Sequence, residues 1–211
     1  MRRIGGHVSM AGSLLNAVSK TRQIGGNCLQ IFAGSPRLWF RKPFPDDQVE
    51  AFLKETQKLD ISPTFIHALY LVNLASTNND ILEKSINSLV IDIQNGARIK
   101  SAGVIVHIGS HLGAGFDAVK DQLVAVIQRI LASTENCNLI LENDAGQNGK
   151  IGSPEEISSL SNIIDVAGGG FHVLALKDDG TVWAATSNGV LLSNGMFYSI
   201  APNGLFGFLH I

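Results

Sequence analysis

Short apolar runs alternate regularly with amphipathic segments along this chain, and this alternation narrows its possible folds more than any other pattern. The apolar runs are continuous and rich in β-branched residues, which is typical of parallel strands buried on both faces. We expect strands at residues 3–8, 27–34, 64–68, 104–108 and 138–143. Apolar residues at helical spacing predict helices near 13–24, 47–59, 78–101, 116–133 and 153–164. Five such units predict an α/β fold, an incomplete (β/α) barrel, because closure needs about eight units.

Several helix ends carry capping signals. Ser13 is expected to cap the first helix, and Asp47 with Glu50 is expected to form a capping box at the second. Gly103 stands where the C-terminal cap of the long helix belongs. The segment 153–156 combines an N-cap serine, a proline and a capping-box glutamate.

The composition changes after about Asp165. From there to Ile211 the sequence has four charged residues and eight glycines. Two pairs of β-rich runs surround Asp179-Gly180 and Asn194-Gly195, which are turn dipeptides typical of hairpins. We therefore expect two domains: a partial barrel over residues 1–165 and a small antiparallel β-hairpin tail over 166–211.

Cysteine usage and hydropathy bear on the compartment. Cys28 and Cys137 lack any metal or redox spacing, which suits a reducing environment. The basic N-terminus is not followed by an apolar segment, and no apolar run reaches 18 residues. We expect a cytoplasmic protein with no membrane partner.

The charges are unevenly placed. Residues 1–45 hold seven of the 16 basic residues and none of the 18 acidic ones. The seven are Arg2, Arg3, Lys20, Arg22, Arg37, Arg41 and Lys42. Such a zone is what a localised contact with a polyanion would need, although solvated surface charges are the more common explanation for a basic cluster.

Three side chains with metal-binding chemistry follow successive predicted strands. His67 ends the third strand, His107 the fourth and Glu142 the fifth. Parallel strands end at one mouth of a barrel, so these side chains are expected to converge. Two histidines and a carboxylate suit a zinc ion that keeps one position for water. Taken singly, each histidine is more often an ordinary buried residue.

The same regions resemble a known family. IGGHVSMAGSLLNAV, QIFAGSPRLW, IHALYLVNLAS, VIVHIGSHLG and LENDAGQNGKIGS resemble, in order, the signatures of endonuclease IV over residues 1–165. That resemblance implies a TIM-barrel, zinc-dependent enzyme of base-excision repair. Its substrate would be double-stranded DNA with an abasic site, cleaved at the phosphodiester on the 5′ side.

The resemblance also implies residue roles. His67, His107 and Glu142 match the ligands of the first of three zinc ions, and Glu142 matches a catalytic residue that bridges to the second. Arg37 and Tyr70 match side chains that enter DNA at the abasic site. We interpret His7 as a supporting residue at the barrel mouth. The family's remaining ligands lie on later strands and have no counterpart after Glu142. We therefore expect one zinc site and an activity reduced on the order of 10³-fold or more.

The tail resembles a different family. VAGGGFHVLALKDDGTVWA, within residues 166–190, is similar to one repeat of a regulator-of-chromosome-condensation type β-propeller. One repeat cannot close a propeller, and His172 in it is expected to be structural. The chain as a whole resembles a truncated, chimeric protein.

Two alternatives stay open at this stage. The chain could be a catalytically inactive partial barrel that binds zinc and DNA, or another metal-dependent barrel such as a sugar isomerase. An open five-stranded sheet also has exposed edges, which favours pairing with the tail or self-association into a homo-oligomer.

Overall fold

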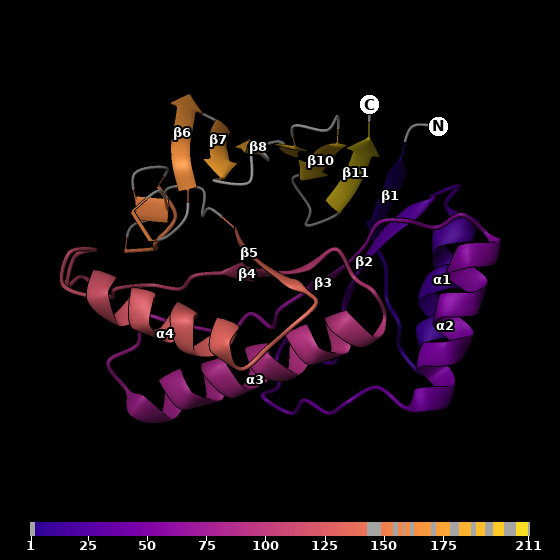
Figure 1. The fold of residues 1–211 in the computed structure, drawn as a ribbon, viewed down its shortest axis with the longest axis horizontal. Helices are drawn as coiled ribbons and strands as arrows, with labels where there is room; N and C mark the ends of the chain where they lie inside the picture. Colours follow the sequence, from indigo (N-terminus) through magenta and orange to yellow (C-terminus); the bar gives the residue numbers. More distant parts are fainter. Residues whose placement is uncertain are drawn as a thin grey trace.

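A computed structural model describes residues 3–142, 149–153, 156–157 and 159–160, and the backbone of six later strands between 163 and 210. Its first part is a curved parallel sheet with helices packed on its outer side (Figure 1). The parallel strands are β1 (Ile4–His7), β2 (Cys28–Phe32), β3 (Thr64–His67), β4 (Gly103–His107) and β5 (Asn138–Glu142). The helices between them are α1 (Leu14–Gln23), α2 (Asp46–Lys58), α3 (Asn79–Arg98) and α4 (Lys120–Ala132).

Neighbouring strands in sequence are neighbours in the sheet, in the order β5-β4-β3-β2-β1. Each pair is parallel, and each crossover between them carries a helix. This is the first part of a (β/α) barrel, as predicted. The register places His107 directly opposite Glu142, and His67 opposite Ile105.

The core lies between the sheet and the helices. Helix α4 turns its predicted apolar face inward, with Leu123, Val126, Ile127 and Ile130 buried. The largest fully buried side chains include Phe52 of α2, together with Leu29, Ile31 and Ile66 of the strands. Between β1 and β2 the backbones approach closely: a Cβ on Gly5 would lie 1.8 Å from the carbonyl oxygen of Cys28. Only glycine fits there without moving the strand.

Two of the predicted caps are correct, and both are made by side-chain oxygens. Ser13 accepts from the backbone N–H of Leu15 at the start of α1. Ser153 and Glu156 form the reciprocal bonds of a capping box, with Ser153 N–H donating to the Glu156 carboxylate and Glu156 N–H to the Ser153 hydroxyl. The short turn they cap does not reach Ile164, because strand β6 begins at Ile163.

Two other predicted caps are wrong. Helix α2 begins one residue earlier than expected, after Pro45, so Asp46 and Asp47 both lie in its first turn and no side chain caps it. Their negative charges instead favour the positive end of the helix dipole. Gly103 starts β4 rather than ending α3. The helix stops at Arg98, and Lys100 adopts the left-handed φ of 53° that the turn requires.

Six strands follow from Ile163 onward, and only their backbone is described. They are β6 (Ile163–Gly169), β7 (His172–Lys177), β8 (Val182–Thr186), β9 (Gly189–Leu192), β10 (Met196–Ile200) and β11 (Phe206–His210). Each pairs antiparallel with the next, and β11 pairs antiparallel with β1. The turn dipeptides Asp179-Gly180 and Asn194-Gly195 lie outside the described residues. Among the helices described, none is both long and apolar enough to cross a membrane.

Candidate metal centre

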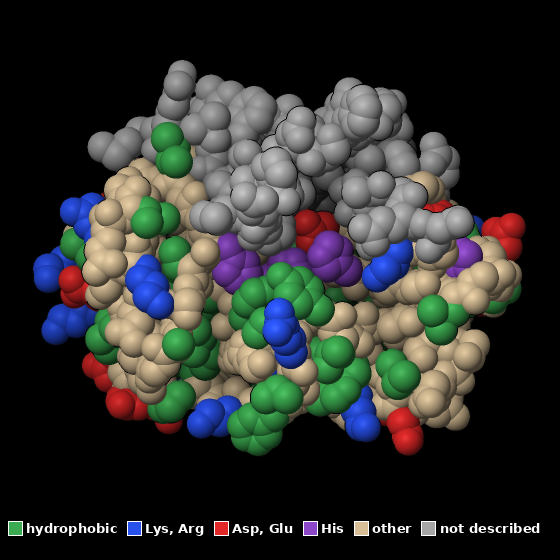
Figure 2. Space-filling view, turned by 180° about the vertical axis from the view of Figure 1, so that it is seen from behind, with side chains coloured by type: hydrophobic (Ala, Val, Ile, Leu, Met, Phe, Trp, Pro, Cys, Tyr) green, Lys and Arg blue, Asp and Glu red, His purple; other side chains and the backbone are tan. Residues whose placement is uncertain are grey.

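The three side chains predicted to bind metal come together at the carboxyl ends of β3, β4 and β5. His67, His107 and Glu142 are the last residues of these strands. One ligand atom from each lies within 4.8 Å of the others. Figure 2 shows histidine side chains grouped next to an acidic one on this side of the molecule. The convergence arises because parallel strands in register end at the same level.

Hydrogen bonding fixes which atoms of the cluster face one another. The Nδ1 atom of His67 lies 2.7 Å from the carbonyl oxygen of Ala68. A carbonyl oxygen can only accept, so Nδ1 carries a proton and Nε2 is the ring atom that faces the other two side chains. That Nε2 atom faces Oε2 of Glu142 at 3.1 Å, and His107 Nε2 lies 3.5 Å from the same oxygen.

This donor set fits a divalent cation. Two ring nitrogens and a carboxylate oxygen are electron-rich atoms, and at these separations they need a proton or a cation between them. Ligand atoms bound to a tetrahedral zinc at 2.0–2.1 Å lie about 3.3 Å apart, close to both distances to Glu142. The carbonyl bonded to His67 Nδ1 is the kind of outer partner that orients metal-binding histidines. Side-chain exposure is 1% for His67, 11% for Glu142 and 35% for His107, so the cluster opens on one side.

The charge state of the carboxylate suits the same role. Burial raises the pKa of Glu142, but the hydrogen bond from His67 and the charges of His107 and His67 together hold that pKa below its ordinary value. Glu142 is therefore ionised at neutral pH. An ionised carboxylate is the form that coordinates metal.

His7 lies behind the cluster, at the end of β1. Burial, followed by the charge of His67, lowers the pKa of His7 to about 4, so its ring is neutral at physiological pH. Gln30 donates from Nε2 to His7 Nδ1 at 2.9 Å, and the Phe32 ring lies 4.2 Å from the His7 ring. Gln30 and Phe32 were not among the residues predicted from the sequence. The sequence feature that could have pointed to Gln30 was its position as a polar residue within the apolar run of β2.

Tyr70 and Arg37 lie on adjoining loops near the cluster. The Tyr70 ring packs edge-on against Phe32 at 5.3 Å and His67 at 6.0 Å, yet the residue is 55% exposed. Its backbone N–H donates to the carbonyl of Pro36, next to the exposed Arg37. Burial and the charge of Glu142 raise the pKa of Tyr70, while Arg37 opposes that rise. Tyr70 therefore contacts the cluster at His67, and Arg37 follows the residue whose carbonyl holds the Tyr70 backbone.

The basic N-terminal zone does not form one surface. Arg3 pairs with Asp60 at 2.7 Å, and Arg41 is buried against Asp92 at 3.1 Å. Lys20 and Arg22 lie in the last turn of α1, which is at the opposite end of the strands from the cluster.

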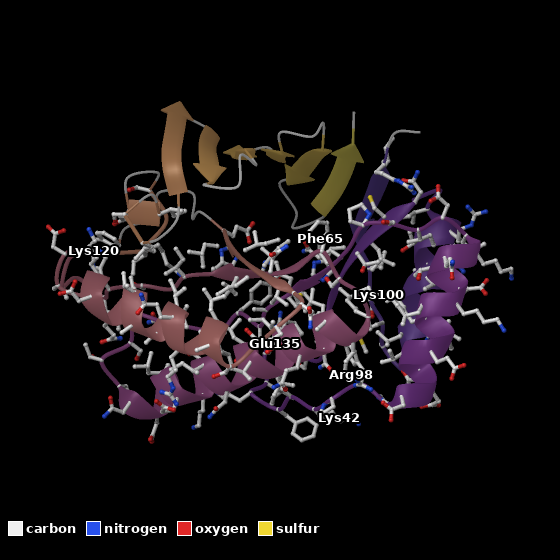
Figure 3. All side chains as sticks on the ribbon, viewed as in Figure 1. Lys42, Phe65, Arg98, Lys100, Lys120 and Glu135 are labelled. Atoms are coloured by element: carbon white, nitrogen blue, oxygen red, sulfur yellow. The ribbon has the colours of Figure 1, made fainter. Side chains whose placement is uncertain are left out.

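Lys42 also lies away from the cluster. Its carbonyl accepts from Asn95 near the C-terminal end of α3, and Figure 3 shows it beside Arg98. Arg2 lies outside the described residues. Of the six basic residues of this zone that the structure describes, Arg37 is the one that adjoins the Pro36–Tyr70 contact.

Other histidines do not join the cluster within the described part of the chain. His111 uses Nδ1 to accept from the backbone N–H groups of Gly113 and Gly115, which organises its own loop. Nothing is described of the side chains of His172 and His210. The two thiols, Cys28 and Cys137, are free.

Comparison with known proteins supports the partial barrel. The family model for the xylose isomerase-like TIM barrel matches residues 18–168, and that for the regulator of chromosome condensation (RCC1) repeat matches residues 163–190. The chain is 37% identical over 150 residues to a probable endonuclease 4 of Haloquadratum walsbyi, covering 71% of this chain and 54% of that protein. It is 36% identical over 156 residues to one of Haloarcula marismortui, covering 74% and 56%.

Solved structures give a similar result. Endonuclease IV from Thermus thermophilus matches with a TM-score of 0.63 and 34% identity, over 73% of this chain and 56% of that one. A D-tagatose 3-epimerase-like protein matches with a TM-score of 0.58 at 17% identity, which shows the shared fold alone. The chain spans about half the length of the curated relatives it matches. It belongs to the xylose isomerase-like TIM barrel family and, within it, is related to the endonuclease 4 proteins.

Proposed function

We propose that this chain binds one zinc ion through His67, His107 and Glu142 and acts on double-stranded DNA at abasic sites. The proposed reaction is hydrolysis of the phosphodiester on the 5′ side of the lesion. The observation that carries the proposal is the three-donor cluster at the mouth of a barrel related to endonuclease 4. Identity to those relatives supports the choice of DNA over a sugar substrate.

The chemistry requires a nucleophile and a means of holding the scissile phosphate. A zinc ion held by three protein ligands supplies hydroxide near neutral pH and polarises a phosphoryl oxygen. His67 is oriented by the Ala68 carbonyl, and Glu142 is ionised, so His67 Nε2 and the carboxylate already face the proposed ion site. Arg37 and Tyr70 are exposed beside the cluster and would contact the DNA backbone and the unstacked site.

We expect the reaction to be slow. Among the described residues, one group of three metal-binding side chains occurs, whereas the related family uses three zinc ions. Without the partner ions, the leaving oxygen and the phosphate charge are less stabilised in the transition state. The rate should fall on the order of 10³-fold below that of a full-length relative.

The test is nicking of an end-labelled duplex that contains one abasic-site analogue. The protein should be purified from a host that lacks its own abasic-site endonucleases. We expect slow nicking that EDTA stops and added zinc restores. Glu142→Gln, prepared in the same way, should not nick, while His111→Ala should nick like the parent.

Two outcomes would contradict this assignment. Equal nicking by the parent and Glu142→Gln would show that the activity does not use the cluster. Retention of the abasic duplex without any nicking would reject the enzyme and favour the non-catalytic binding protein. The intact duplex without the lesion serves as the control for non-specific binding.

We further propose that the chain divides near residues 165 and 166 into a partial barrel and an unrelated tail. The two family matches support this division, since one ends at 168 and the other begins at 163. Pairing of β11 with β1 leaves β5 and β6 as the end strands through which two copies could associate. Sedimentation of the full chain at several concentrations would test that self-association.

A further inference from the structure

The side chain of Arg41 lies beneath the loop that connects β2 to α2. Its Nη1 atom donates to three backbone carbonyls of that loop: Ser35 at 3.0 Å, Leu38 at 3.3 Å and Phe40 at 3.1 Å. A Cβ on Gly34 would come within 3.0 Å of the same nitrogen, so the missing side chain leaves room for the guanidinium. One cation thus gathers the carbonyls of a six-residue segment.

Asp92, on the inner face of α3, holds the other side of this guanidinium. Arg41 Nε lies 3.1 Å from one carboxylate oxygen of Asp92 and 3.4 Å from the other. The exposed fraction is 1% for the Arg41 side chain and 0% for that of Asp92. The two residues are 51 positions apart, so the pair fastens the loop to a helix formed much later in the chain.

A buried ion pair of this kind is poor evidence for stability. Burial raises the pKa of Asp92 to about 7, against the opposing charge of Arg41, which shows how costly it is to hold this carboxylate away from water. The attraction between two buried charges contributes about as much free energy as their desolvation costs. Replacing both residues of such a pair by apolar ones therefore often leaves stability unchanged. What the pair does provide is a fixed geometry, because guanidinium donors are directional and three loop carbonyls accept from the same nitrogen.

The held segment carries exposed side chains beside the candidate metal centre. Arg37, Leu38 and Phe40 all project from it into solvent. The Pro36 carbonyl accepts from the N–H of Tyr70 at 3.0 Å, which joins the loop to the residue that packs on His67. Loop and tyrosine are therefore joined, and the tyrosine ring in turn contacts the cluster at His67.

We propose that Arg41 and Asp92 are positioning residues that fix residues 35–40, and with them Arg37, in the conformation that receives DNA. This inference rests on the proposed function for its ligand, but not for the anchoring of the loop. A loop already ordered before binding loses less conformational entropy when DNA arrives, so affinity rises without any new contact. Neither residue needs to touch DNA.

The test uses a double variant, Arg41→Met/Asp92→Leu. It removes both charges together, so no unpaired charge stays buried and the fold should survive. The matched control is Arg129→Met/Glu83→Leu, which removes another Arg–carboxylate pair whose acidic partner also lies on α3. That pair is about half exposed, and it is not part of the loop anchor.

The first measurement needs no DNA. Hydrogen exchange of the backbone amides of residues 35 and 37–40 should accelerate about tenfold or more in the double variant, with the exchange of α1 and α4 unchanged. Zinc content should equal that of the parent. Unchanged exchange in the loop would overturn the anchoring role, whatever the DNA result.

The second measurement is affinity for a duplex with one abasic-site analogue. The dissociation constant should rise about tenfold in the double variant, a loss of about 1.4 kcal/mol, and should not change in the control. A mobile loop with unchanged affinity would overturn the positioning role. Failure of the parent itself to bind would instead reject the proposed function, and with it the assignment of DNA as the ligand that the loop receives.

Discussion

The Nε2 atom of His67 lies 3.1 Å from Oε2 of Glu142, although 75 residues separate the two in sequence. The approach is a property of the sheet: both residues end parallel strands, on either side of β4. The Ala68 carbonyl then determines which nitrogen of His67 faces the carboxylate. The pair gives the cluster a preset geometry for a cation.

Loss of the carboxylate should abolish tight zinc binding. The parent is expected to bind about one zinc ion per chain. For Glu142→Gln we expect affinity to fall on the order of 10²-fold or more, since loss of even an outer partner commonly costs about 10- to 100-fold. Competition with a zinc-binding dye measures the change. His111→Ala is the control, because this histidine lies outside the cluster. Equal affinity in Glu142→Gln and the parent would rule out the site.

The divided basic zone predicts unequal effects of removing its charges. Arg37→Ala should weaken binding to abasic duplex DNA about tenfold and reduce the salt dependence by about one released counterion. Lys20→Ala and Arg22→Ala remove the same charge at the far end of the strands and should leave affinity unchanged. Fluorescence anisotropy at several salt concentrations separates these results. Similar losses in all three variants would indicate non-specific attraction.

Both thiols should react slowly in the folded chain. Burial raises the pKa of Cys28 to about 12 and that of Cys137 to about 11. At pH 8 the thiolate fraction of Cys28 is therefore about 10³-fold below that of an ordinary cysteine, and it grows about tenfold per pH unit. Iodoacetamide labelling followed by mass spectrometry should find both thiols protected until denaturant is added. Rapid labelling of the native chain would contradict their burial.

The same shifts set the direction of a pH effect on stability. Because the folded-state pKa values lie above those of the unfolded chain, the unfolded state releases thiol protons first as pH rises above about 9. The free energy of unfolding should then decrease with increasing pH. Replacing Cys28 by serine should reduce this decrease. Denaturant titrations at about pH 8 and about pH 10 provide the comparison.

Two phenylalanines provide a matched test of the core. Phe52 is 0% exposed on the buried face of α2, whereas Phe40 is 73% exposed on its loop. Phe52→Ala should lower the free energy of unfolding by about 3–5 kcal/mol, because a cavity replaces a packed ring. Phe40→Ala should change it by no more than about 0.5 kcal/mol. A large loss in both variants would place the loop ring inside the core.

Local patterns in the sequence were sufficient to predict those structural features that depend mainly on neighbouring residues. The positions of the five parallel strands and of α1 to α4 were predicted to within a few residues, because periodicity reports which face of an element is buried, whereas the helix predicted near 153–164 is cut short where β6 begins at Ile163. Caps were less predictable. Ser13 caps as expected, but α2 begins directly after Pro45, ahead of the expected capping box, and Lys100 makes the turn assigned to Gly103.

The order of the strand–helix units, and the placement of His67, His107 and Glu142 at successive strand ends, could be predicted from the amino-acid sequence alone. The surroundings of these residues could not, because they depend on how the elements pack. Pairing of Arg41 with Asp92 and of Arg3 with Asp60 takes two cations out of an apparently basic surface. The hydrogen bond between Gln30 and His7 likewise depends on the pairing of β1 with β2. These contacts join residues far apart in the chain, so no local pattern identifies the partners.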